Sequence, residues 1–320
     1  MKTREIGATG LKVPPLCFGA SGLGDMPDTY GYSVDAARAE ATLQAIFDGP
    51  AKFLDTARLY GLGRSEERIG AAIRARGGLP PGFVLSTKLD RDLETGRFDA
   101  AQARRSLEQS LKALGLDRIP MLHLHDPEHC RDLQEITGKG GALEAMFGFK
   151  EQGLVDAVGL AMGRVDMMLD ILRDWPFDTL ISHNRYTLLN RSAGPVFDHA
   201  HGQGMAVLNA APYASGVLAK GSAEMPLIAY QKADDAALAP VRRIEEVCAA
   251  HGVAVGPVAL QFSMRDPRIA STVVGVTRPE RVAQTLDWAA VEVPEALWRD
   301  LDGLGYSTED PEANREYKPG

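Results

Sequence analysis

Several features that define whole classes of protein are scarce or missing in this sequence. Its three cysteines, Cys17, Cys130 and Cys248, are far apart and odd in number, which disfavours a disulfide framework. They fit buried thiols in a reducing cytoplasm. The chain has no run of about 18 apolar residues, and its first residues lack an apolar stretch of signal-peptide length. We therefore expect neither a membrane-spanning nor a disulfide-rich protein.

An excess of basic residues is also absent. The net charge is −8 and no basic stripe stands out, so we expect neither nucleic acid nor an anionic membrane as a partner. What the chain has is an ordinary hydrophobic fraction of 45%, enough for a large core. No repeat or low-complexity linker divides it. The sequence predicts one domain over residues 1–320, acting in the cytoplasm as a monomer or weak homo-oligomer.

Strand-like and helix-like segments alternate along the chain. Near-continuous apolar runs, typical of a parallel sheet covered by helices, begin at Val13 (the weakest), Lys52, Phe83, Met121, Ala157, Thr179, Met205 and Ser271. Helical patterns begin at Ser33, Ser65, Asp99, Gly141, Arg164, Gly194, Leu238 and Pro279. Such strand–helix units predict an α/β fold, the (β/α)8 TIM barrel. An open doubly wound sheet is the alternative, but no G-x-G-x-x-G follows the first strand.

Local signals predict the ends of several elements. Ser65 is expected to be the N-cap of a helix, and Thr277 with Glu280 matches a capping box. Glycines stand where the C′ position of a helix is expected, at Gly115, Gly153 and Gly204. The first dozen residues contain "GATG" between short β-like runs. They predict a small β-hairpin before the barrel.

Polar residues fall at the predicted strand ends, where the chemistry of a barrel is located. Asp55, Lys88 and His125 end neighbouring strands, and Tyr60 lies in the loop after Asp55. An ammonium stabilises a phenolate and lowers its pKa, and a carboxylate compensates the buried ammonium. Such a set suits transfer of a proton beside a cofactor that carries a hydride. The alternative is a structural ion pair with Tyr60 as loop packing.

The segment "HLHDPEHC", residues 123–130, also resembles a metal site. His123 and His125 would point the same way on a strand, and H-x-H at a barrel strand end begins the site of one class of metal hydrolases. That site needs further ligands on later strands, where only His183 is available. We therefore expect no metal. His125 is expected to face the substrate alone, and His123 to be a hydrogen-bonded residue of the barrel interior.

Four segments resemble, in order, the aldo-keto reductase superfamily: "FLDTARLYGLGRSEERIGAAI", "FVLSTK", "IPMLHLHDPE" and "VVGVTRPERVAQT". The resemblance covers nearly the whole chain, and D-T-A-x-x-Y-G followed by S-E is highly specific. It implies a barrel that binds a nicotinamide cofactor across the top, with Asp55, Tyr60, Lys88 and His125 as catalytic tetrad. In that family the tyrosine is acid in reduction and base in oxidation, and the lysine lowers its pKa. The aspartate holds the lysine, and the histidine positions the substrate oxygen.

Residues 185–219 resemble in particular one branch, that of D-threo-aldose 1-dehydrogenases (L-fucose dehydrogenases), pyridoxal 4-dehydrogenases and L-galactose dehydrogenases. The branch implies oxidation of a fucose-, galactose- or arabinose-like aldose at C1 to the lactone. The alternatives are an NADPH-dependent aldehyde or ketone reductase and a pyridoxal 4-dehydrogenase. A regulatory subunit of a membrane channel is a non-enzymatic alternative, because such subunits keep the tetrad. Loops after Gly22 and Glu128, the segment 214–235 and the tail from Tyr306 are expected to set the substrate.

The resemblance also places the cofactor, NAD or NADP. The implied binding residues are Gly19, Ala20, Ser21, Asp55, His183, Asn184, Ala211, Tyr213, Ser215, Leu218, Gly275, Val276, Thr277, Arg278, Arg281, Gln284 and Thr285. Gly275 and Val276 stand where many NADPH-dependent members have a lysine and a serine for the 2′-phosphate. Arg278 and Arg281 remain as cations, so NAD is slightly favoured.

The residues that usually anchor nicotinamide differ here. His183 replaces a glutamine, Ala210 a stacking tyrosine, and Ala161–Met162 a Ser–Asn pair, while Thr285 stands for an asparagine near the adenine. Asn184 or Tyr213 are the candidates to compensate.

Overall fold

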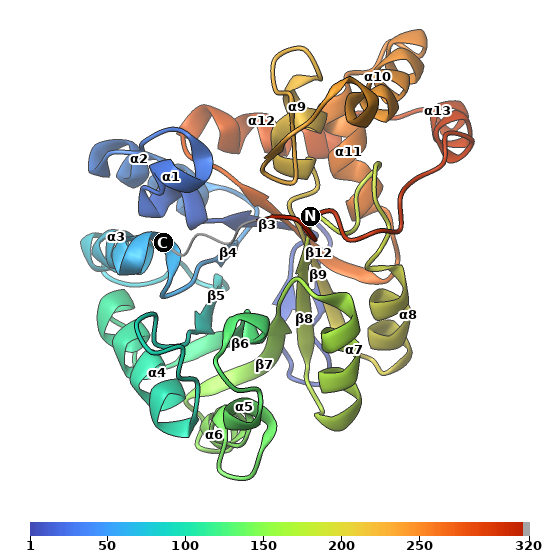
Figure 1. The fold of residues 1–320 in the computed structure, drawn as a ribbon. Helices are drawn as coiled ribbons and strands as arrows, with labels where there is room; N and C mark the ends of the chain where they lie inside the picture. The colour runs from blue at the N-terminus through green and yellow to red at the C-terminus, as the bar shows by residue number, and fades with distance from the viewer. Residues whose placement is uncertain (316–320) are drawn as a thin grey trace.

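Eight parallel strands close into a barrel in the computed structural model, which describes residues 1–315 (Figure 1). Neighbours around the barrel follow the chain order, and the last strand pairs with the first. The strands are β3 (Leu16–Gly19), β4 (Phe53–Asp55), β5 (Val84–Leu89), β6 (Ile119–His125), β7 (Val155–Ala161), β8 (Thr179–His183), β9 (Ala206–Ala210) and β12 (Ile269–Gly275). The predicted (β/α)8 TIM barrel is confirmed.

Helices surround the barrel (Figure 1). One helix follows each strand and packs on the outside of the barrel: α2 (Ala36–Asp48), α3 (Arg64–Ala75), α4 (Ala100–Leu114), α6 (Ala142–Glu151), α7 (Val165–Asp174), α8 (Gly194–Gly202), α11 (Val255–Met264) and α12 (Pro279–Ala290). The remaining helices are α1 (Pro27–Tyr30), α5 (Gln134–Thr137), α9 (Val217–Lys220), α10 (Asp235–Ala250) and α13 (Glu295–Asp302). Single 3-10 turns are η1 (Ser21–Gly24), η2 (Tyr60–Gly63), η3 (Pro127–His129) and η4 (Ala214–Gly216), and a second hairpin pairs β10 (Leu227–Ile228) with β11 (Gln231–Lys232).

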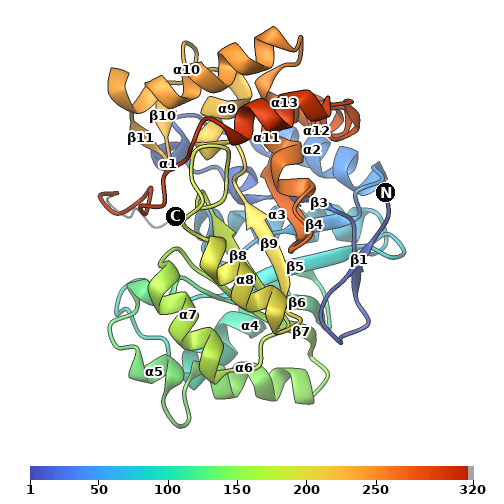
Figure 2. The same cartoon turned by 90° about the vertical axis from the view of Figure 1, so that its right-hand side faces the viewer.

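The prediction of the helix that covers the barrel between β9 and β12 is wrong. The pattern from Leu238 predicts the covering helix, but the helix there, α10, packs beside α13 on the outside (Figure 2). The helix that covers β12 is α11, which was not predicted from the sequence. Its sequence "VGPVALQFSM" is apolar nearly all round, because six of its ten residues are buried. It therefore lacks the one-sided period by which an amphipathic helix is recognised.

Two predicted helix caps are wrong because their hydroxyls serve tertiary contacts. Ser65 lies inside α3, where its Oγ donates to the carbonyl of Ala20 at 2.9 Å and lies 2.9 Å from Thr56 Oγ1. Thr277 precedes the N-cap of α12, Arg278, and within residues 1–315 no side chain caps that helix. The predicted C′ glycines Gly115, Gly153 and Gly204 do take a positive φ, of 69°, 73° and 73°.

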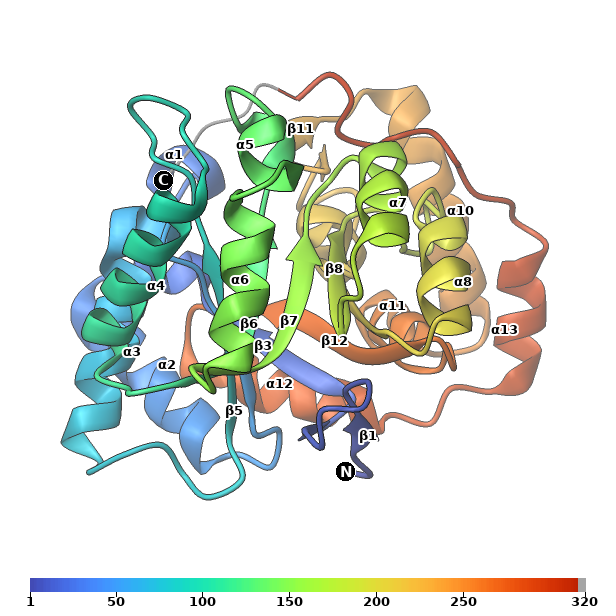
Figure 3. The ribbon, with the colours of Figure 1, turned by 90° about the horizontal axis from the view of Figure 1, so that it is seen from below.

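The N-terminal hairpin is confirmed and closes one end of the barrel. Strand β1 (Arg4–Glu5) pairs antiparallel with β2 (Lys12–Val13). Ile6 and Val13 pack with inward-facing apolar residues of the barrel, such as Phe53 and Met121. The hairpin and the C-terminal segment lie at opposite ends of the molecule (Figure 3). The end over the carboxyl ends of the strands is thus left for a site.

The thiols and the apolar helices complete the fold. Cys17 and Cys248 are buried as expected, but Cys130 is only half-buried. Within residues 1–315, no single helix is long and apolar enough to cross a membrane. Helices α10 and α11 reach that length only as a pair bent by 100°, and α11 is largely buried in the fold.

Candidate active site

The side chains that point into the barrel change from apolar to polar along each strand. On β5 the inward positions are Val84, Ser86 and Lys88, and on β6 they are Met121, His123 and His125. Lys88 pairs with His123 across the two strands, so these two side chains lie at the same level along the barrel axis. The carboxyl ends of the strands thus bring charged groups to one place, as the side-chain period of two requires.

Lys88 is the centre of this polar layer. Its Nζ lies 2.7 Å from Asp55 Oδ2, 2.6 Å from the carbonyl oxygen of Thr56 and 3.1 Å from Tyr60 Oη. The residue is 1% exposed, so three acceptors match the three protons of the ammonium. Asp55 Oδ1 also accepts from Ser86 Oγ at 2.9 Å. The predicted contact of Asp55, Lys88 and Tyr60 therefore exists in the structure.

The glycine after Tyr60 holds the tyrosine in place. Gly61 has a φ of 60°, and a Cβ there would lie 1.9 Å from the carbonyl oxygen of Gly24. Only glycine can turn the chain so close to η1. The "Y-G" of the motif is thus a backbone requirement of the loop that carries the phenol.

The acidity of Tyr60 differs from the expectation. Burial raises the pKa of its phenol well above the ordinary value, and the carboxylate of Asp55 raises it further. The sequence predicted a lowered pKa because of Lys88. That prediction is wrong for the protein alone, because burial first, and then the negative charge of Asp55, raise this pKa. Tyr60 is therefore a protonated phenol at neutral pH.

His125 is held by a carboxylate that the sequence analysis missed. Its Nδ1 lies 2.6 Å from Asp90 Oδ1, and Asp90 Oδ2 accepts the backbone N–H of Leu59 at 2.9 Å. Burial lowers the pKa of His125, but Asp126 and Asp90 outweigh burial and raise it. Asp90 thus fixes both the imidazole and the loop before Tyr60. The ring planes of Tyr60 and His125 meet edge-on, with centroids 5.8 Å apart.

His123 lies one layer deeper than His125 and is fully buried. Its Nδ1 is 3.2 Å from Ser86 Oγ, so the predicted hydrogen-bonded histidine of the barrel interior is confirmed. Burial, and then Lys88, lower the pKa of His123 well below the ordinary value. It is neutral, which does not suit a second catalytic acid. Among residues 1–315, no group of three or more His, Cys, Asp or Glu side chains is placed to hold a metal ion.

A cavity of about 640 Å³ opens above these residues. It is lined by all four residues Asp55, Tyr60, Lys88 and His125 and by most of the predicted cofactor residues: Gly19, Ser21, His183, Ala211, Tyr213, Ser215, Gly275, Val276, Thr277, Arg278, Arg281, Gln284 and Thr285. Three others within the described chain, Ala20, Asn184 and Leu218, do not line it. Those three are better explained as supporting residues behind the lining.

Asn184 is occupied by the C-terminal segment. Its Nδ2 donates to Glu312 Oε1 at 2.8 Å, and His183 Nε2 lies 3.1 Å from the same oxygen. Burial would raise the pKa of Glu312, but the charges and hydrogen bonds of His183, Asn184 and Arg185 hold it well below its usual range. The sequence could not place this contact, because its partners are more than a hundred residues apart. Only the amide nitrogen of Asn184 is occupied, since its Oδ1 has no hydrogen-bond partner within residues 1–315, so its contact with nicotinamide stays a prediction.

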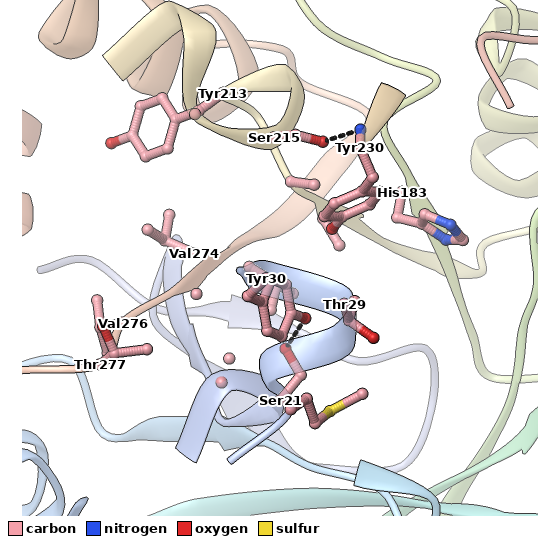
Figure 4. A pocket seen from close by; sticks show the side chains of 18 of the residues that line it. Ser21, Thr29, Tyr30, His183, Tyr213, Ser215, Tyr230, Val274, Val276 and Thr277 are labelled. Atoms are coloured by element: carbon pink, nitrogen blue, oxygen red, sulfur yellow. Dashed lines mark hydrogen bonds between the residues drawn. The ribbon is translucent and has the colours of Figure 1, made fainter. Parts of the chain in front are cut away.

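Tyr213, the other compensating candidate, lines the cavity (Figure 4). Its ring meets Trp288 edge-on at 5.8 Å. Its hydroxyl is buried, has no hydrogen-bond partner within residues 1–315 and lies close enough to Arg281 for that charge to act on its pKa. The contact of Tyr213 with nicotinamide therefore stays a prediction.

One end of the cavity is cationic. Arg278 and Arg281 lie there as predicted, and Arg38 of α2 joins them. Arg38 Nε donates to the carbonyl of Thr277 at 2.7 Å and its Nη2 to Thr277 Oγ1 at 3.3 Å. Arg38 was not predicted to line this site, because it lies near the opposite end of the chain from Thr277. These three arginines suit an anionic group.

Aromatic side chains from separate loops line the other end. Tyr30 Oη lies 2.7 Å from Ser21 Oγ, and the backbone N–H of Tyr230 donates to Ser215 Oγ at 2.7 Å (Figure 4). The two tyrosine rings meet edge-on at 6.1 Å. They belong to the loops expected to set the substrate, after Gly22 and within 214–235. Residues 316–320 of the expected tail lie outside the described residues.

Comparisons with known proteins agree with this geometry. Residues 15–305 match the Aldo/keto reductase family. The chain is 30% identical over 321 residues to a D-threo-aldose 1-dehydrogenase of Pseudomonas sp, covering 92% of this chain and 94% of that enzyme. It is 27% identical over 340 residues to a pyridoxal 4-dehydrogenase of Microbacterium luteolum, covering 94% and 97%. An aldo-keto reductase from Bacillus halodurans, solved in its holo form, shares the fold with a TM-score of 0.79 at 21% identity, covering 99% of this chain and 100% of that one. The chain therefore belongs to the aldo/keto reductase family.

Proposed function

We propose that this oxidoreductase oxidises an aldose of the fucose, galactose or arabinose type at C1 to the lactone, with NAD or NADP. The observation that carries the proposal is the contact of Tyr60 Oη with Lys88 Nζ at 3.1 Å on the floor of the cavity. The similarity to a D-threo-aldose 1-dehydrogenase supports the sugar as substrate. The cytoplasm remains the predicted location.

Each side chain has a role in this proposal. The nicotinamide cofactor would accept the hydride from C1. Tyr60, once deprotonated, takes the proton of the C1 hydroxyl, while Lys88 stabilises the phenolate and Asp55 balances Lys88. His125 donates from Nε2 to the same oxygen, because Asp90 occupies Nδ1. The hydrogen on C1 leaves with the two electrons of its C–H bond, as a hydride, and the C1–O single bond becomes the lactone carbonyl.

The lining fits an extended dinucleotide. The arginines Arg38, Arg278 and Arg281 would meet phosphates or the adenosine ribose. Gly275 and Val276 offer no polar side chain to a 2′-phosphate. We therefore propose that both cofactors are usable and that NAD is slightly preferred.

Two variants test the cofactor preference. Arg281→Ala should weaken NADP more than NAD, by about ten- to hundredfold in kcat/KM, the worth of one charge-assisted contact of about 1.5–3 kcal/mol. Gly275→Lys should shift the ratio towards NADP, since a Cβ at Gly275 meets no atom within 4 Å. The measurement is kcat/KM for both cofactors in all three proteins. If Arg281→Ala lowers kcat/KM equally for both cofactors, Arg281 does not contact the adenosine ribose phosphate.

The pKa of Tyr60 predicts the pH profile. The raised value means that the phenolate fraction grows about tenfold per pH unit throughout the neutral range. Oxidative kcat/KM should therefore rise steadily with pH and still be rising at about pH 9, whereas reduction should not fall over that range through loss of the Tyr60 proton. A plateau of the oxidative rate near neutral pH would show that binding of the cofactor and substrate lowers the pKa of Tyr60 strongly.

An aldehyde or ketone reductase that uses NADPH is the second candidate. The observation in its favour is that the protein alone holds Tyr60 protonated and raises the pKa of His125. Both groups are then ready to donate to a carbonyl oxygen.

A substrate panel decides between the candidates. Aldoses, simple aldehydes and pyridoxal should be tested with NAD, NADP and their reduced forms. We expect oxidation of aldoses with the highest kcat/KM and release of a lactone, detected by its hydrolysis to the acid. A higher kcat/KM for aldehyde reduction would establish the reductase, and one for pyridoxal oxidation a pyridoxal 4-dehydrogenase.

A further inference from the structure

Asp126 is a carboxylate in the cavity that acts on the proposed proton transfer only through its charge beside His125. It follows β6 directly and lines the cavity, with 15% of its side chain exposed. Its nearest ion-pair partner within residues 1–315 is His125 Nε2, 3.6 Å from Oδ2. That separation is too long for a hydrogen bond. The oxygen therefore faces the cavity beside the atom of His125 that meets the substrate.

The backbone aims this carboxylate at a cost. Asp126 has a φ of 44° and a ψ of 53°, the left-handed region that a side chain seldom adopts. Its N–H is fixed by the carbonyl of Ala161 at 2.8 Å, and its carbonyl accepts from His129 at 3.1 Å. Such strain persists where the surroundings impose it and is concentrated at functional positions. The backbone of Asp126 is thus held by β7 on one side and by the turn η3 on the other.

The charges around Asp126 indicate what kind of group it would bind. Burial would raise its pKa, but His125 first, and then other neighbours that include Arg91, lower it, so the group is an anion. Arg91 and His125, whose pKa is raised, already bring positive charge to Asp126, which disfavours a further cation as ligand. The neighbouring lining residues Ala161 and Met162 offer no polar side chain. A neutral donor, such as a hydroxyl, remains the group that satisfies the free oxygen.

We propose that Asp126 accepts a hydrogen bond from the hydroxyl on the carbon next to the reacting one, and so selects neutral 2-hydroxy carbonyl compounds and their cyclic hemiacetals. This rests on the proposed function. Asp126 Oδ2 lies 3.6 Å from His125 Nε2, so with O1 at Tyr60 and His125 Nε2 a hydroxyl on the adjacent carbon, C2, can reach it. Asp126 is then a specificity-determining residue, and the proton transfer does not pass through it.

The left-handed backbone allows a clean set of variants. Asp126→Gly removes the carboxylate and keeps a conformation that glycine adopts freely. Asp126→Asn keeps the shape and also tolerates this region, but loses the charge. Asp117→Gly is the control, because Asp117 is exposed in the turn before β6, at the end of the strand away from the cavity, and does not line the cavity. The readout is the ratio of kcat/KM for an aldose and its 2-deoxy analogue.

We expect the wild type to favour the aldose by about ten- to hundredfold, the worth of one hydrogen bond to a charged group. The ratio should fall to within about threefold of unity in Asp126→Gly, be intermediate in Asp126→Asn, and be unchanged in Asp117→Gly. Loss of Asp126 also lowers the pKa of His125, but that effect acts on both sugars alike and cancels in the ratio, so a purely structural or electrostatic role would leave the ratio unchanged. An unchanged ratio in both Asp126 variants overturns the inference. Failure of every protein to oxidise any aldose overturns the proposed function instead.

Discussion

Replacement of Tyr60 by phenylalanine should lower turnover by about two to four orders of magnitude, the usual worth of a positioned acid or base. The phenol oxygen is the only part removed, and it is the atom that contacts Lys88 Nζ at 3.1 Å. The ring would keep its edge-on contact with His125. Binding of the cofactor should be nearly intact, because the cationic end and Tyr213 are unaffected.

Binding and turnover can be separated experimentally. Trp288 lines the cavity beside Tyr213, so quenching of tryptophan fluorescence reports cofactor binding without turnover. Tyr306→Phe is the matched control, since Tyr306 is 50% exposed and outside the cavity; its turnover should equal that of the wild type. If Tyr60→Phe retains more than about a tenth of the wild-type turnover, Tyr60 is not the proton-transfer residue.

The sequence predicted best those residues whose place follows from local rules. Asp55, Lys88 and His125 each lie at an inward position near the end of a strand, so strand period and strand end suffice to bring them together. The loop of Tyr60 follows from Gly61, which alone allows the close approach to Gly24. These positions depend on contacts within one strand–loop unit and its neighbour.

The sequence failed where distant segments meet. Arg38 reaches Thr277, and Glu312 reaches Asn184, across separations that no local pattern encodes. The helix α11 escaped notice because it is buried nearly all round and has no polar face. The pKa of Tyr60 was misjudged for a related reason. The direction in which this pKa shifts depends on burial and on the charges around the phenol, such as that of Asp55. That balance is determined only once the site is assembled.

Replacement of Lys88 by methionine should have the second large effect, on stability as well as on turnover. Lys88 and Asp55 form a buried ion pair at 2.7 Å, with 2% and 6% of their side chains exposed. Loss of the ammonium leaves the Asp55 carboxylate buried without its counter-ion, which typically costs about 3–5 kcal/mol. Turnover should also fall by at least about two orders of magnitude, because nothing then stabilises the Tyr60 phenolate.

The double variant Asp55→Asn/Lys88→Met separates the two consequences. It removes both buried charges, so the free energy of unfolding should recover to within about 1–2 kcal/mol of the wild type, whereas turnover stays as low as in Lys88→Met. The free energy of unfolding is measured by urea unfolding followed by circular dichroism, and turnover by steady-state rates. Both are measured for the wild type, the two single variants and the double variant. A double variant no more stable than Lys88→Met would show that the lost stability comes from packing rather than charge. Recovery of turnover along with stability would mean that Lys88 serves the fold and takes no part in proton transfer.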